Sequence, residues 1–244
     1  MCTISKKKVE WTIDSTFIKK IKQSLIYDTD EIAGVLLFED TDCKAGTCNK
    51  KSTEFVIKRG DGASVYTPNG IINFHTHPNS CYESENAVYG WPSGEDMSQV
   101  IHFAKIGNMI HIVFSKEGAY VIKVNTLLKP KDIKILEKIF KMTHVYRSSN
   151  QSEQKNDFRK KFLISGRTTV DMWLKLVNGI TPTMLHKLNN LFMTKKRERR
   201  SEPPSDDTKI FEVQLIPMGK TLTFTANFIE EKCHAKSFGK SRKE

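Results

Sequence analysis

The spacing of apolar residues along the first half of the chain predicts alternating helices and strands. In residues 15–26 apolar side chains recur every three or four positions, which is typical of an amphipathic helix that Asp14 or Ser15 caps, and 93–105 shows the same spacing. Apolar runs predict strands at 31–38, near 54–58 and at 71–77, a hairpin of 109–115 and 119–124, and a polar loop over 39–52. This alternation predicts an α/β fold.

The second half has a less regular pattern. Helices are predicted over 130–146, 171–177 and 183–196, and polar linkers over 148–156 and 197–209. Two strand-like runs, 210–217 and 221–229, flank Met218, Gly219 and Lys220. We therefore expect a mostly helical extension that ends in a β-hairpin.

Charge also divides the chain near its middle. Of the net charge of +11, residues 1–128 contribute 14 Lys and Arg against 15 Asp and Glu, whereas residues 129–244 contribute 25 against 13. This shift predicts two parts, 1–128 and 129–244. The basic excess of the second part favours an acidic partner, either a protein surface or nucleic acid.

The most basic run, residues 195–200, has three interpretations: a nuclear localisation signal, a nucleic-acid contact or a solvated helix end. No RRM, KH or zinc-finger pattern accompanies it, so sequence-specific recognition is not indicated.

Other bulk features indicate the compartment. No apolar run is long enough to cross a membrane, and the first residues lack the apolar segment of a secretory signal. The five cysteines are odd in number and scattered, which is typical of reduced thiols. A cytoplasmic or nuclear protein is expected.

The candidate metal-binding residues lie between positions 73 and 96. His75 and His77 are two residues apart on a predicted strand, so their side chains lie on the same face. Asp96, at the start of a predicted helix, could complete a set of two histidines and one carboxylate. Such a set leaves a fourth position for water, which is the arrangement of catalytic rather than structural zinc.

A hydrolase of this kind also needs a proton acceptor that is not on the metal. Glu31, at the start of a predicted buried strand, is the candidate for this general base. Ser93, three residues before Asp96, could donate a hydrogen bond to a tetrahedral oxyanion. Ser93-x-x-Asp96 is also the pattern of a helix capping box, and capping is compatible with metal ligation.

Taken in order, Glu31-x-x-Gly34, His75-x-His77-Pro78 and Ser93-x-x-Asp96 resemble the JAMM (JAB1/MPN/Mov34) metalloproteases over residues 9–126. The resemblance implies a JAB1/MPN-type αβα sandwich with a mixed sheet. It implies one zinc ion on His75, His77 and Asp96, with Glu31 as general acid/base and Ser93 as oxyanion support. The family includes enzymes that cut isopeptide bonds to ubiquitin or ubiquitin-like modifiers, and scaffold members that have lost the metal.

The stretch between His77 and Ser93 is longer than is usual in that family. The extra residues, 79–91, are expected to form a loop at the mouth of the site, where loops tolerate insertions. The loop could select substrate or act as a lid. Alternatively, Cys81 or Glu83 could occupy the open zinc position and make the enzyme latent.

Other metal-binding residue types are interpreted more simply. His102 and His111 are expected to have structural or surface roles, and Cys43 and Cys48 could help to hold a second metal only with partners that are not evident. A zinc nucleoside deaminase is excluded, because His-x-Glu and Pro-Cys-x-x-Cys are both absent.

The sequence thus predicts a zinc-dependent, deubiquitinase-like isopeptidase that docks through its basic C-terminal region. One alternative is a non-catalytic or latent scaffold in a large assembly, such as a viral particle, because the motif context is also similar to JAMM-domain proteins of large DNA viruses. Another is a nucleic-acid-associated protein.

Overall fold

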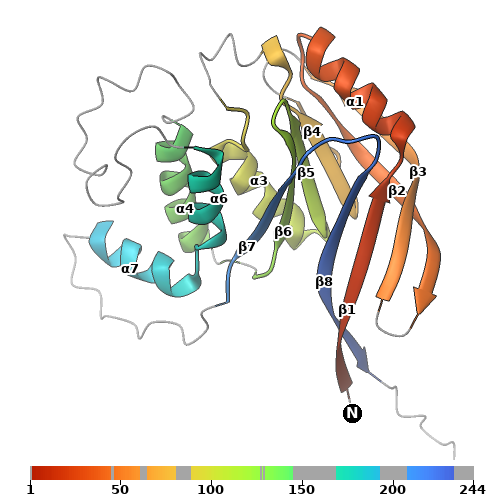
Figure 1. The fold of residues 1–244 in the computed structure, drawn as a ribbon. Coiled ribbons are helices and arrows are strands. Elements are labelled where there is room, and N and C mark those ends of the chain that lie inside the picture. Colours follow the sequence, from red (N-terminus) through yellow and green to blue (C-terminus); the bar gives the residue numbers. More distant parts are fainter. Residues whose placement is uncertain are drawn as a thin grey trace, which may run out of the picture.

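The computed structural model describes residues 2–44, 47–60, 65–80, 89–126, 128, 130–144, 169–192 and 208–233 (Figure 1). Its strands are β1 (Cys2–Ile13), β2 (Ile32–Lys44), β3 (Thr47–Arg59), β4 (Ile72–Thr76), β5 (Ile110–Ser115), β6 (Gly118–Val124), β7 (Phe211–Ile216) and β8 (Leu222–Cys233). Its helices are α1 (Ser15–Tyr27), α3 (Gly94–Lys105), α4 (Pro130–His144), α6 (Val170–Asn178) and α7 (Pro182–Phe192).

These strands form one mixed sheet in the order β7-β6-β5-β4-β2-β3-β1-β8. The pairs β1–β3 and β4–β5 are parallel, and the other neighbours are antiparallel. The two edge strands, β7 and β8, are joined by residues 217–221, and Nε2 of Gln214 donates to the carbonyl of Thr225 at 3.3 Å. The sheet therefore curls until its edges approach each other, and the predicted α/β class is confirmed.

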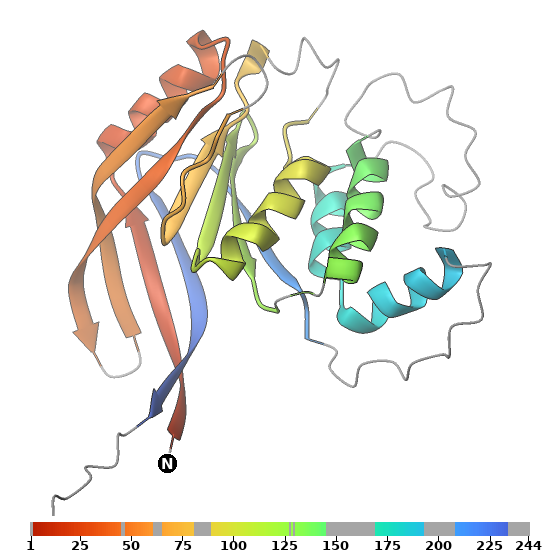
Figure 2. The same cartoon turned by 180° about the vertical axis from the view of Figure 1, so that it is seen from behind.

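Helices cover both faces of the sheet, as the views from the two sides show (Figures 1 and 2). Helix α1 buries Phe17 against Phe74 of β4 and Phe114 of β5, with ring centroids 5.0 and 5.8 Å apart. Helices α3, α4 and α6 pack on the opposite face, where Val113 and Tyr120 belong to their core. Successive strand residues face opposite sides, so β5 and β6 contribute to both cores.

The predicted helices and most predicted strands are confirmed within one to four residues, but two expectations are wrong. The polar segment 39–52 is not a loop, because β2 continues to Lys44 and β3 begins at Thr47. The C-terminal strands do not form a hairpin with each other. Phe211 of β7 pairs with Val124 of β6, whereas Leu222 of β8 pairs with Ile13 of β1. Each segment pairs with a strand that is distant in sequence, and residues 217–221 link the two edges of the sheet.

Strand β1 was not predicted, although Val9, Trp11 and Ile13 alternate with polar residues as a half-buried strand does. The expected boundary after residue 128 falls between β6 and α4. Strands from both sides of it share the sheet, and α4 and α6 share a core with α3 and β6. The predicted linker 148–156 and the basic run 195–200 lie outside the described residues. None of the described helices is long and apolar enough to span a bilayer.

Gly34 lies where the backbone of β2 is closely approached by its neighbours. A Cβ added there would lie 1.9 Å from the carbonyl oxygen of Val56 and 2.7 Å from the Phe74 ring. We expect Gly34→Ala to lower the free energy of unfolding by about 3 kcal/mol, because the strands must separate to admit the methyl group. Gly219→Ala, where the nearest atom lies at 3.4 Å, should change it by less than about 0.5 kcal/mol. Urea unfolding of both variants checks this, and equal effects would contradict it.

The shared sheet also has a consequence for truncation. A fragment of residues 1–128 lacks both edge strands and the helices that cover Trp91 and Tyr120. We expect it to lack a cooperative thermal transition and to elute as aggregates in gel filtration, because the uncovered apolar face remains exposed. A monomeric fragment that melts near the temperature of the full chain would refute this expectation.

Candidate metal centre

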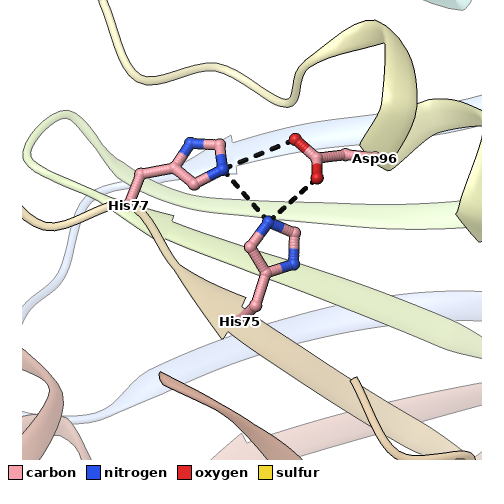
Figure 3. Close-up of side chains that lie close together, drawn as sticks. All are labelled: His75, His77 and Asp96. Atoms are coloured by element: carbon pink, nitrogen blue, oxygen red, sulfur yellow. Dashed lines mark hydrogen bonds and ion pairs between the residues drawn. The ribbon is translucent and has the colours of Figure 1, made fainter. Parts of the chain in front are cut away.

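The two histidines lie at the end of a strand in the middle of the sheet. His75 of β4 pairs with Ala33 of β2 on one side and with Val113 of β5 on the other. His77 follows β4 directly, and its backbone N–H donates to the carbonyl of Phe114 at 2.8 Å. Both rings are buried, and their Nε2 atoms lie 3.1 Å apart (Figure 3). The strand therefore directs both Nε2 atoms to one point.

Asp96 reaches the same point from the first turn of α3. Its Oδ1 lies 3.2 Å from Nε2 of His75, and its Oδ2 lies 3.4 Å from Nε2 of His77 (Figure 3). The predicted capping box is confirmed, because Ser93 Oγ accepts from the Asp96 backbone N–H and the Asp96 carboxylate accepts from that of Ser93. The box fixes the position of the carboxylate, so capping and ligation use the same residue.

This geometry suits a metal ion. One donor atom from each of His75, His77 and Asp96 lies within 4.8 Å of the others. Nitrogen ligands of a tetrahedral zinc ion lie about 3.3 Å apart, given bonds of about 2.0–2.1 Å. The observed separations of 3.1–3.4 Å are close to this value. The three residues predicted as ligands could therefore hold one ion together.

The charge state of Asp96 also suits a ligand. Burial alone would raise the pKa of Asp96, but the charge of His75 and hydrogen bonds from the His75 and His77 rings outweigh it and hold this pKa well below its usual range. Asp96 is therefore ionised at neutral pH, which is the form that binds metal.

Glu31 lies beside the ligand set. It is buried immediately before β2, and its Oε1 lies 3.8 Å from Nε2 of His77. The next residue, Ile32, donates its N–H to Oγ1 of Thr76 at 3.0 Å, which ties the start of β2 to the strand of the histidines. Glu31 is outside the group of three candidate ligands. Ser93 also borders the site, because it caps the helix that carries Asp96.

Each ligand histidine has a second partner at Nδ1. Nδ1 of His77 donates to the carbonyl of Gly90 at 2.9 Å, and Nδ1 of His75 lies 2.9 Å from Nε2 of His111. Burial lowers the pKa of His111 well below its usual value, and nearby His75 and His77 add to the effect. His111 is therefore neutral at pH 7. The sequence predicts a structural or surface role for both His111 and His102. His111 is buried directly behind the candidate ligand His75, whereas His102 is exposed on α3.

Both ends of the inserted stretch are attached to the site. At one end, Oγ of Ser80 donates to the carbonyls of Asp28 and Thr29 near Glu31, at 3.3 and 3.1 Å. At the other, the Gly90 N–H donates to Oε1 of Glu117 at 3.0 Å. Residues 81–88 lie outside the described part, and with them the proposed fourth ligands Cys81 and Glu83. Cys43 and Cys48 are register partners across β2 and β3.

An aromatic stack holds the second end. Trp91 stacks on Tyr89 and on Trp173 of α6, with centroids 5.2 and 6.0 Å apart. Trp91 follows Gly90, whose carbonyl accepts a hydrogen bond from Nδ1 of His77. By stacking on Trp91, helix α6 therefore supports the candidate metal centre. No local sequence signal links Trp173 to this site.

Comparison with known proteins gives one relative of interest. No family model matches the chain. "Uncharacterized protein 3R" of Frog virus 3 (isolate Goorha) is 27% identical over 173 residues, covering 70% of this chain and 38% of that protein. The chain therefore spans well under half the length of this relative. The relative's name states no activity.

Metal binding can be tested through stability. At a free zinc concentration 100 times the Kd, we expect the free energy of unfolding to rise by about 2.7 kcal/mol, because the ligands converge only in the folded chain. Asp96→Asn keeps an oxygen that can accept from the Ser93 N–H but removes the ligand charge, so it should weaken binding at least about tenfold. Thermal unfolding with zinc and with chelator, and isothermal titration, check both points, with His102→Ala as control. Wild-type and Asp96→Asn protein with equal affinity would contradict the assignment.

Proposed function

We propose that this protein is a zinc-dependent isopeptidase of the JAMM type. The observation that carries the proposal is the position of the Glu31 carboxylate, 3.8 Å from a ligand nitrogen but outside the group formed by His75, His77 and Asp96. Two histidines and one carboxylate leave a fourth position for water, and a separate carboxylate can move that water's proton.

Glu31 and Ser93 have different roles in the proposed hydrolysis. When bound, zinc supplies Lewis acidity, which lowers the pKa of a coordinated water towards 7 and polarises the scissile carbonyl. Glu31 takes a proton from the water as its oxygen bonds to the carbonyl carbon, and returns the proton to the amine nitrogen as the C–N bond breaks. Ser93 Oγ accepts from the Asp96 N–H, and its own proton can point to the carbonyl oxygen as negative charge develops there.

The proposed substrate class follows from the resemblance to JAMM metalloproteases, namely conjugates of ubiquitin or a ubiquitin-like modifier. Their isopeptide bond joins a carboxyl terminus to a lysine amine, and its cleavage needs the proton transfer assigned to Glu31. The proposal also includes docking, in which the basic segment 129–244 binds an acidic partner.

Glu31→Gln tests the role of the base. The amide keeps the size of the side chain but cannot accept the proton, so we expect kcat/KM for isopeptide cleavage to fall about 10²–10⁴-fold while bound zinc remains stoichiometric. The full-length protein should be assayed against ubiquitin chains and a panel of ubiquitin-like conjugates, with metal content measured in parallel. Glu39→Gln, an exposed position on β2, is the matched control.

Two results would count against the proposed isopeptidase activity. Cleavage that survives Glu31→Gln would remove the carboxylate from the mechanism. Bound zinc without cleavage of any conjugate would favour the non-catalytic scaffold, for which a role in an assembly such as a viral particle would then be sought by isolating its partners.

A further inference from the structure

A row of buried polar side chains lies behind His75. It consists of Asn108, which follows α3, Asn73 of β4 and His111 of β5, and we call it the polar row. The ring of Phe103 on α3 lies against His111, with centroids 5.6 Å apart. Polar groups buried in this way are stable only if each donor meets an acceptor.

Backbone carbonyls fix the direction of these hydrogen bonds. Nδ2 of Asn108 lies 2.8 Å from the carbonyl oxygen of Gly70, and Nδ2 of Asn73 lies 3.2 Å from that of Pro68. A carbonyl oxygen only accepts, so both amide nitrogens must donate to it. The amide oxygen of Asn73 therefore points into the row, where it accepts from Nδ2 of Asn108 at 3.0 Å.

The same oxygen determines where His111 carries its proton. Nδ1 of His111 lies 2.7 Å from Oδ1 of Asn73 and must donate to it. A neutral imidazole with its proton on Nδ1 has a lone pair on Nε2. That lone pair faces Nδ1 of His75 at 2.9 Å, so His75 donates from Nδ1. With the Nδ1 proton held in this way, Nε2 of His75 is the nitrogen whose lone pair is available to a metal ion placed between it, His77 and Asp96.

We propose that His111 is a positioning residue that holds His75 in the tautomer whose Nε2 can bind metal at this site, through a row anchored in the backbone at residues 68–71. Ligand histidines usually donate their second N–H to a carboxylate, a carbonyl or water, as His77 does to Gly90. For His75 a second imidazole serves this purpose. The inference rests on the metal site of the proposed function and not on its substrate.

Metal affinity of the full chain tests the proposal. His111→Phe keeps the ring but removes the acceptor, and should weaken Zn²⁺ and Co²⁺ binding by about 10–100-fold in chelator competition. His111→Gln, whose amide oxygen can accept near the position of Nε2, should restore most of the affinity. The exposed His102→Phe is the control. Affinity of a folded His111→Phe protein within about twofold of wild type would overturn the proposal, as would a wild type that binds neither metal.

A second measurement needs no substitution. In zinc-loaded wild-type protein, ¹⁵N NMR of the histidine rings should place the His111 proton on Nδ1 and show a hydrogen bond from Nδ1 of His75 to Nε2 of His111. A proton on Nε2 of His111 would overturn the assignment. If these results hold and no isopeptide is cleaved, the proposed function fails while the role of His111 stands.

Discussion

Burying two imidazole rings at the end of a central strand requires a suitable partner for each of four ring nitrogens. Two of them, the Nε2 atoms, face Asp96 and each other, so they need either protons or a metal ion between them. The other two must donate if the first two are to bind metal. The protein meets this condition with the carbonyl of Gly90 for His77 and with Nε2 of His111 for His75.

Both supports connect the candidate centre to groups outside the ligand set. Behind His75, the polar row reaches the segment that leads into β4. Behind His77, Gly90 is held through Trp91, which stacks on Trp173 of α6. The residues after 128 thus support the site indirectly, through Trp91, and also form both edges of the sheet. A boundary drawn from charge alone does not reveal this shared packing, since the net charge of a segment does not determine which core it joins.

The parts of the site that could be predicted from the sequence are those with local signals. His75 and His77 are two residues apart on an apolar strand, and Ser93-x-x-Asp96 marks the first turn of a helix, so short-range geometry suffices. Glu31 is predicted from its place at the start of a buried strand and from the order of its motif relative to the others, but its position beside His77 depends on the pairing of β2 with β4. The role of His111 could not be found this way, because its contacts with Asn73 and His75 cross from β5 to β4. The same limit explains the error over β7 and β8, whose turn resembles that of a hairpin although their partners lie far away in the chain.

The pairing of β1 with β8 bears on how the chain reaches its fold. Thr12 and Thr223, which meet across these strands, are 211 residues apart in sequence. Closing a loop of this length costs entropy that no contact repays until the strands meet, so this step should be slow and late. Within the described part of the chain, residues 2–7 pair with β8 alone, and until β8 arrives they form an open edge that other chains could join. The candidate ligands lie within residues 75–96, so bringing them together requires the closure of a much shorter loop than joining β1 to β8 does.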